Sequence, residues 1–109
     1  MKLLLDRRKI KMLEIIKKFA KIDAIEFTIH AREKMLVREI KSFDIKQTLL
    51  QGEIIEEYID DKPYPSFLLC GKLDEKYLHV VCAVAGKQLL IITTYYPDEN
   101  IWLNPRKRR

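Results

Sequence analysis

The spacing of the apolar residues changes at Gly52, and this change constrains the fold more than any other feature of the chain. Before Gly52, apolar residues recur at intervals of three and four, as on one face of an amphipathic helix. After Gly52, apolar and polar residues alternate, as along a half-buried strand. The links at 74–76 and 86–87 are too short for crossover connections. The sequence therefore predicts an α+β fold in which N-terminal helices precede a four-stranded antiparallel sheet.

Three helices are predicted before Gly52. The first is a basic amphipathic helix over 3–22, and the second begins near Thr28, a favourable N-cap, and runs to about Glu39. Ser42 caps the third helix, which stops at Gly52, the usual C′ residue. The apolar stripe of the first helix consists of Leu5, Met12, Leu13, Ile15, Ile16, Phe19 and Ala20.

The four predicted strands span 53–59, 66–73, 77–85 and 88–96. The segment 25–27 fits either a further short strand or a connector. If 86–87 is a two-residue turn followed by regular pairing, His79 faces Thr94 and Tyr95 falls on the core side. A change of one residue in the turn would reverse the face that the last strand shows.

Composition favours one domain over residues 1–109, expected in a reducing cytoplasm. A chain of 13.0 kDa has room for one core, and 34% charged residues exclude a membrane-embedded protein. We also expect no membrane partner. The apolar start of the chain ends too early for a signal peptide. Cys70 and Cys82 lie in apolar segments without C-x-x-C spacing, so we expect buried free thiols.

Positive charge is concentrated at the two ends of the chain. Residues 1–21 carry eight basic and two acidic side chains, and 106–109 are all basic, whereas 22–105 carry nine basic and fourteen acidic side chains. The ends either meet to bind the phosphates of RNA or DNA, or form a solvated helix face and a disordered tail. A third interpretation pairs the basic tail, 103–109, with the acidic patch of the same or another subunit. Nearby Trp102 either caps the sheet edge or stacks on a base.

The second predicted helix carries a cationic stripe. His30, Lys34 and Arg38 recur at intervals of four. Ile29, Leu36 and Ile40 cluster on a different side, the expected core face. A histidine among cations tends to stay neutral and able to accept a proton near pH 7. Alternatively, the stripe is a solvated face whose cations pair with nearby acids.

A second candidate, His79, lies in the strand predicted at 77–85. The apolar residues of that strand share one face, so His79 points to the other. Alternatively, His79 is a packed residue that is hydrogen-bonded to a neighbour. The spacing of the histidines and cysteines does not fit zinc, and the chain has neither a Gly-rich phosphate loop nor a G-x-S-x-G elbow. We therefore expect no metal and no cofactor.

A series of short motifs resembles one family of small prokaryotic proteins. Residues 30–40 read HAREKMLVREI, similar to the family pattern H-A-x-x-R-M-x-x-R-x-I, with Lys34 in place of an arginine and Glu39 where glycine is frequent. Asp-Ile at 44–45, L-H-V-V at 78–81, T-x-Y-x-P at 93–97 and the tryptophan at 102 follow in the family's order. The family is a domain of unknown function regarded as akin to the BrnT and RelE toxins, and its members commonly accompany a YgiT-type zinc-finger antitoxin. The resemblance covers residues 27–102.

This resemblance implies a toxin of a type II toxin–antitoxin pair that is a metal-independent endoribonuclease. The RNA 2′-hydroxyl would attack the adjacent phosphate, so the protein must supply proton transfer and positive charge. The residues implied are His30 and His79 for proton transfer, Arg32, Lys34 and Arg38 for phosphate binding, and Tyr95, Arg106 and Arg108 for further RNA contacts. The expected register places Tyr95 in the core, which argues against an RNA contact by Tyr95. The implied partners are RNA, free or on the ribosome, and a cognate antitoxin of the zinc-finger type.

The competing class is a protein- or nucleic-acid-binding module without catalysis. Acidic residues gather at 53–61, and such a surface repels RNA. The first helix would then serve in a homo-oligomer, or as the place where an antitoxin docks.

Overall fold

The computed structural model describes residues 2–109, with side chains from Arg7 onward, so Leu5 of the predicted apolar stripe lies outside the described side chains. The helices are α1 (Lys2–Lys21), α2 (Ile29–Arg38) and α3 (Ser42–Gln51). The strands are β1 (Ile25–Phe27), β2 (Glu53–Tyr58), β3 (Ser66–Leu73), β4 (Lys76–Ala85), β5 (Gln88–Tyr95), β6 (Trp102–Asn104) and β7 (Lys107–Arg108). The three predicted helices and four predicted strands are all present, within one or two residues of their predicted bounds.

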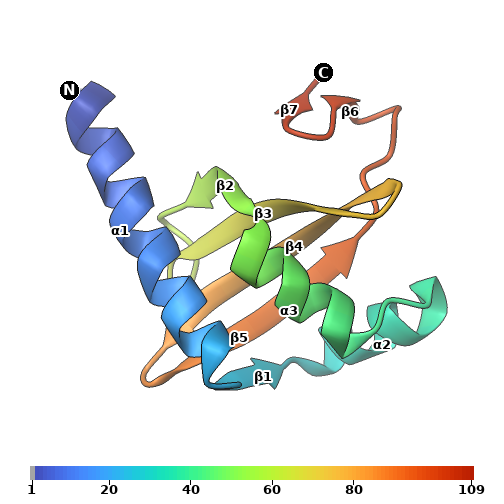
Figure 1. Ribbon diagram of the computed structural model, residues 1–109, viewed down its shortest axis with the longest axis horizontal. Helices are drawn as coiled ribbons and strands as arrows, with labels where there is room; N and C mark the ends of the chain where they lie inside the picture. The colour runs from blue at the N-terminus through green and yellow to red at the C-terminus, as the bar shows by residue number, and fades with distance from the viewer. Residues whose placement is uncertain (1) are drawn as a thin grey trace.

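The main sheet has five strands in the order β1-β5-β4-β3-β2, where four antiparallel strands were predicted (Figure 1). Strands β2 to β5 form the expected antiparallel meander, and β1 adds a parallel edge strand beside β5. Backbone bonds from Leu89 N to Ala24 O (2.8 Å) and from Thr28 N to Ile91 O (3.0 Å) extend this pairing. The sheet is therefore mixed, because the connector after α1 runs along its open edge.

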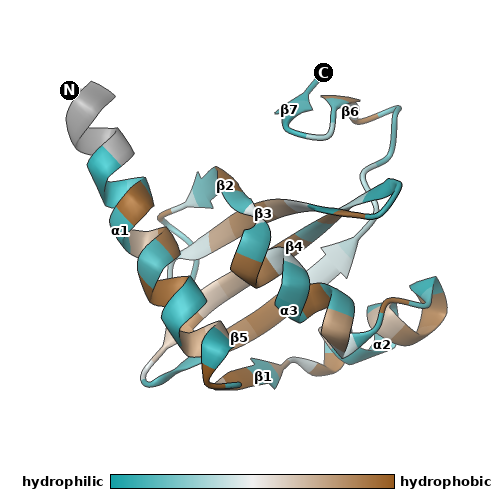
Figure 2. Ribbon diagram, viewed as in Figure 1, coloured by the Kyte–Doolittle hydropathy of each residue, from teal (hydrophilic) through white to brown (hydrophobic). Residues whose placement is uncertain are grey.

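Helices α1 and α3 cover one face of the sheet, and the main core lies between them and the strands (Figure 1). The strands beneath the helices are largely hydrophobic (Figure 2). Fully buried members of this core include Ile16, Ile45, Leu49, Leu78, Val80, Leu89 and Ile91. Truncation of one such side chain to alanine typically costs about 2–5 kcal/mol, so this layer holds the sheet rigid beneath the opposite face.

The C-terminal segment covers the opposite face of the sheet. Trp102 packs there with Leu68 and Val81 in a second, smaller cluster, and β6 and β7 pair with each other as a hairpin. Arg106 forms an ion pair with Glu53 of β2. Residues 103–109 thus lie against the acidic strand β2 of the same chain. This agrees with the third interpretation of the basic tail, in which it pairs with an acidic patch. Trp102 lies on the sheet face rather than at its edge.

The N-cap of α2 is as predicted, whereas both ends of α3 differ from their predictions in local detail. Thr28 is the N-cap of α2, as predicted, because its hydroxyl accepts a hydrogen bond from Ala31 N (3.0 Å). Helix α3 has Lys41 as its N-cap rather than Ser42. Gly52, at the other end, has extended dihedral angles instead of the left-handed ones of a C′ glycine. A Cβ at Gly52 would lie only 2.5 Å from the carbonyl oxygen of Thr48, so close packing requires the glycine.

The apolar face predicted for α2 is correct only at Ile40, which is buried in the core. Ile29 and Leu36 are 77% and 82% exposed, and the helix instead turns Ala31 and Met35 toward the core. Polar groups of α2 and of Thr28, its cap, bond to β5, and these bonds turn the side that carries Ile29 and Leu36 toward solvent.

Cys70 and Cys82 are free and buried, as predicted. Burial raises the pKa of both thiols, that of Cys82 to about 12, so both remain protonated at neutral pH. Within residues 2–109, none of the helices combines the length and the apolar character that a membrane crossing requires.

Candidate functional site

Three hydrogen bonds attach helix α2 and its N-cap residue to three consecutive residues near the end of β5. Thr28 Oγ1 donates to Ile92 O (3.0 Å), His30 Nε2 lies 3.0 Å from Thr93 Oγ1, and Arg38 donates from NH1 to Thr94 O (2.8 Å). Two members of the predicted cationic stripe, His30 and Arg38, therefore bond to the end of β5, although both remain exposed to solvent. The T-x-Y-x-P segment begins at this junction.

A β-bulge in β5 changes the face on which Tyr95 lies. Pairing is regular as far as Cys82 opposite Ile91, and Ile92 is then the extra residue, so Val81 faces Thr93. His79 consequently faces Tyr95 instead of Thr94, and the register predicted for this part of the strand is wrong. Tyr95 and Thr93 share the face of His79, away from the main core. The expected register, which placed Tyr95 in the core, therefore no longer argues against a contact between Tyr95 and RNA.

His79 is fully buried beneath the C-terminal hairpin. Its ring lies edge-on to Trp102, with ring centres 4.5 Å apart, and its Nε2 is 2.6 Å from the carbonyl oxygen of Pro105. Because a carbonyl only accepts, Nε2 carries the proton and Nδ1 is unprotonated. Nδ1 is buried and has no hydrogen-bond partner among the described residues. Burial lowers the pKa of His79, so the imidazole is neutral at pH 7.

A network of three side chains holds the hairpin on β2. Arg108 donates from Nε to Glu56 Oε2 (2.8 Å), and Tyr58 donates its hydroxyl to Glu56 Oε1 (2.5 Å). Burial by itself would raise the pKa of Glu56, but the hydrogen bonds from Arg108 and Tyr58 outweigh it and lower the pKa. The Arg108 guanidinium also stacks on Trp102, with Cζ 4.5 Å from the ring centre. Arg108 is therefore fixed in position with its remaining N–H donors available.

These parts enclose a cavity of about 340 Å³ between α2, the end of β5 and the hairpin. We call it the Arg38 cavity, and its lining includes Arg38, Tyr95, Tyr96, Asp98, Trp102 and Arg108. Burial raises the pKa of Tyr95, so its hydroxyl stays protonated and able to donate. The lining thus combines two guanidinium groups and a phenol with one carboxylate, that of Asp98, and its donors suit an anion.

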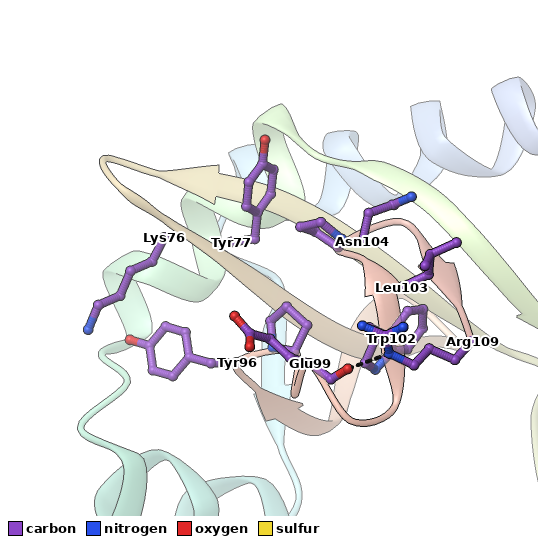
Figure 3. A pocket seen from close by; sticks show the side chains of 10 residues that line it. Lys76, Tyr77, Tyr96, Glu99, Trp102, Leu103, Asn104 and Arg109 are labelled. Atoms are coloured by element: carbon purple, nitrogen blue, oxygen red, sulfur yellow. Dashed lines mark hydrogen bonds between the residues drawn. The ribbon is translucent and has the colours of Figure 1, made fainter.

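A larger cavity of about 710 Å³ lies beside the first (Figure 3). We call it the tyrosine cavity, and its lining includes Lys76, Tyr77, Tyr96, Trp102, Asn104 and Arg109. Tyr96 and Trp102 line both cavities, so the two are adjacent.

Comparison with known families decides the classification of the chain. Residues 27–96 match the model of a domain of unknown function, DUF4258, and the match covers more than half of the chain. The chain belongs to the DUF4258 family. No curated protein and no solved structure was found to match it.

The DUF4258 domain contains most of the predicted site residues, and its fold separates them into two groups. Arg38 and Tyr95 line the Arg38 cavity, and His30 of α2 bonds to Thr93, which lies two residues before Tyr95 on β5. Arg32 lies elsewhere, because it pairs with Glu26 (3.8 Å) and stacks on Phe27. Lys34 is half-buried on the same helix.

The C-terminal hairpin lies outside residues 27–96 yet completes the site of this DUF4258 chain. Arg108 reaches the Arg38 cavity, whereas Arg106 stacks on Tyr77, with Cζ 5.3 Å from the ring centre. Glu56 and Asp98 are site residues that the sequence analysis missed. The spacing of Glu56 and Tyr58, two residues apart on one face of a strand, was the signal that could have indicated the first.

Among the described side chains, from Arg7 onward, no three of His, Cys, Asp or Glu gather closely enough to hold a metal ion.

Proposed function

We propose that this chain is the toxin of a type II toxin–antitoxin pair and cleaves RNA as a metal-independent endoribonuclease. One observation carries the proposal: Arg38 of α2 and Arg108 of the C-terminal hairpin line a single cavity together with Tyr95. This arrangement provides fixed donors for a phosphate and for the charge that develops on it.

The reaction requires no group beyond the protein and the RNA. The 2′-oxygen forms a bond to the adjacent phosphorus, the bond from phosphorus to the 5′-oxygen breaks, and a 2′,3′-cyclic phosphate remains. A base takes the 2′-hydroxyl proton, an acid protonates the departing 5′-oxygen, and cations stabilise the pentavalent phosphate between them.

The guanidinium groups act from fixed positions. Arg38 is anchored through NH1 to Thr94 O, and Arg108 through Nε to Glu56, so each keeps further N–H groups for a phosphate. Tyr95 adds a hydroxyl donor to the same lining. Because these donors are already ordered, they need little rearrangement when the phosphate binds.

His30 is the better placed of the two histidines for proton transfer. It is exposed at the α2–β5 junction, with its Nε2 on Thr93 Oγ1, and Thr93 shares the sheet face of Tyr95. With the hairpin in place, Trp102 and Pro105 separate His79 from any RNA, so we assign His79 to positioning the hairpin and Tyr95. The proton-transfer role of His79 remains a prediction that requires the hairpin to move.

The partners of this function are RNA, free or on the ribosome, and a cognate antitoxin. The exposed apolar side chains Ile29, Leu36 and Val37 on α2 provide a surface for protein contact close to the Arg38 cavity. An antitoxin bound there would obstruct the approach of RNA.

A binding module without catalysis is the second candidate. It is favoured by the complete burial of His79 and by the Glu56 carboxylate, which already neutralises Arg108. In that case the Arg38 cavity holds an anionic group without cleaving it.

Inducible expression with growth monitoring separates the two candidates. Wild type should arrest growth, and Arg38→Ala should not, because it removes a phosphate donor from the cavity. Arg32→Ala is the matched control, since it removes the same charge from the same helix away from the cavity. Equal arrest by wild type and Arg38→Ala, or no arrest by soluble wild type, would contradict the nuclease proposal.

A further inference from the structure

The tyrosine cavity has walls that suit a flat aromatic ligand. Tyr77 comes from β4, Tyr96 follows β5, and Trp102 begins β6, so three aromatic side chains from different elements line one space (Figure 3). Pro97 and Pro105 add rigid apolar surface. Such walls favour planar rings, since aromatic faces stack on them with little loss of side-chain freedom.

Cations lie over two of the aromatic rings that line this cavity. Lys76 Nζ is 5.2 Å from the ring centre of Tyr96, and Arg106 Cζ is 5.3 Å from that of Tyr77. Arg109 also lines the cavity, anchored by a bond from its Nε to the backbone oxygen of Glu99 (2.6 Å). Aromatic surface bordered by Lys and Arg is the combination that binds single-stranded nucleic acid.

Two polar side chains in the lining can contact the edge of a bound ring. The Asn104 Oδ1 atom accepts a hydrogen bond from Arg106 N (2.8 Å), which leaves its amide N–H groups to donate to a ligand. The Glu99 side chain lines the same space and provides acceptors. A donor and an acceptor together match the edge of a nucleobase.

We infer that the tyrosine cavity binds one unstacked nucleobase of single-stranded RNA. This inference rests on the proposed function: Tyr96 and Trp102 border both cavities, so a nucleotide with its phosphate at Arg38 and Arg108 places its base beside them. Lys76 and Arg106 cover ring faces of Tyr96 and Tyr77, so the base stacks in place of one of these cations or on an uncovered ring face. This contact holds the base out of the strand, and the 2′-hydroxyl is released from helical geometry.

The single tryptophan of the chain provides a direct readout, because Trp102 lines the cavity. The full chain is titrated with a short single-stranded oligodeoxynucleotide, which lacks the 2′-hydroxyl and cannot be cleaved. We expect quenching of Trp102 fluorescence, and affinity reduced roughly 5- to 150-fold when one nucleotide is made abasic, as for the loss of one stacked base.

Tyr77→Ala should weaken binding of the base-bearing oligonucleotide by a similar factor and leave the abasic one unaffected. Tyr77→Phe should bind like wild type because it keeps the ring, and Tyr64→Ala, in the turn before β3, is the control for an exposed tyrosine elsewhere. Equal affinity for the base-bearing and abasic oligonucleotides, or no quenching, would overturn the inference.

The outcome does not depend on catalysis. Base-dependent binding without any RNA cleavage would refute the nuclease and keep the base pocket. Cleavage with equal binding of both oligonucleotides would refute the pocket and keep the nuclease. Quenching by proline-rich peptides but not by oligonucleotides would assign the cavity to a protein partner and overturn the inference.

Discussion

Tyr95 of β5 and His79 of β4 lie directly opposite each other, with their ring centres 5.2 Å apart. Ile92 makes this pairing possible, because its bulge moves Tyr95 from the helix-covered face to the face beneath the hairpin. In a regular ladder, Tyr95 would point into the main core and the Arg38 cavity would lose its phenol. The local irregularity of the strand thus builds the candidate site.

Replacement of Tyr95 by phenylalanine should separate its packing from its chemistry. The ring remains on His79, so we expect a change of less than about 0.5 kcal/mol in the free energy of unfolding, as for substitutions that keep packing. Loss of a hydrogen bond to a charged phosphate should slow RNA cleavage by roughly 10- to 100-fold. Urea unfolding and a cleavage assay on the same preparation test this, and an unchanged cleavage rate would remove Tyr95 from the site.

The free energy of unfolding should decrease as the pH is lowered, because of His79. Burial places its folded pKa below the usual value of 6.5, so its contribution is complete above 6.5 and decreases as the pH falls toward the folded pKa. Urea unfolding from about pH 7 to about pH 5 should show this decrease. It should persist in His30→Ala, which removes the only other histidine, and disappear in His79→Phe. An identical slope in His79→Phe would contradict the assignment.

Glycine at position 39 should stabilise the protein. Glu39 ends α2 in the left-handed region, at φ 55°, where a side chain is strained and glycine is not. We expect the free energy of unfolding of Glu39→Gly to be about 0.5–1 kcal/mol higher than that of the wild type. Glu39→Gln controls for the lost charge and should show no such gain. A Glu39→Gly protein that is less stable than Glu39→Gln would disprove the explanation. The strain also accounts for the glycine in the family pattern.

Alanine at Gly52 should be more harmful than alanine at Gly86. The new Cβ would meet Thr48 O at 2.5 Å and Cys70 O at 2.7 Å, so α3 must move away from β3 at a cost of about 1–3 kcal/mol. Gly86 has φ 67° with open space around it, so its alanine variant bears only the backbone strain, about 1–2 kcal/mol. Gly86→Asn, which tolerates that conformation, should be nearly neutral. Thermal unfolding of the three variants tests this order, and a more stable Gly52→Ala than Gly86→Asn would contradict it.

Periodicity predicted the helices and four strands because it reports which side of each element is buried. It left β1 undecided between a strand and a connector, because three residues are too short to show a period. It failed at Ile92, where two adjacent residues share a face. It also misplaced Ile29 and Leu36, because hydrogen bonds to β5, rather than apolar contacts alone, orient α2.

The candidate site was partly accessible from the sequence. The motif residues His30 and Arg38 were found, since they lie on one helix at a recognisable spacing. The contact between Arg108 and Glu56 joins residues that are 52 positions apart, and only opposite charge suggested it. Long-range closure of this kind depends on the register of the sheet and the path of the hairpin, neither of which leaves a local pattern.

The most direct test of the central claim is the chemistry of RNA ends in cells that express the protein. Total RNA from cells with wild type, Arg38→Ala and Arg32→Ala is examined for new 5′-hydroxyl and 2′,3′-cyclic phosphate ends. The account predicts such ends with wild type and Arg32→Ala, and a strong reduction with Arg38→Ala. New ends that are as abundant with Arg38→Ala as with wild type would contradict the Arg38 cavity as the site of cleavage.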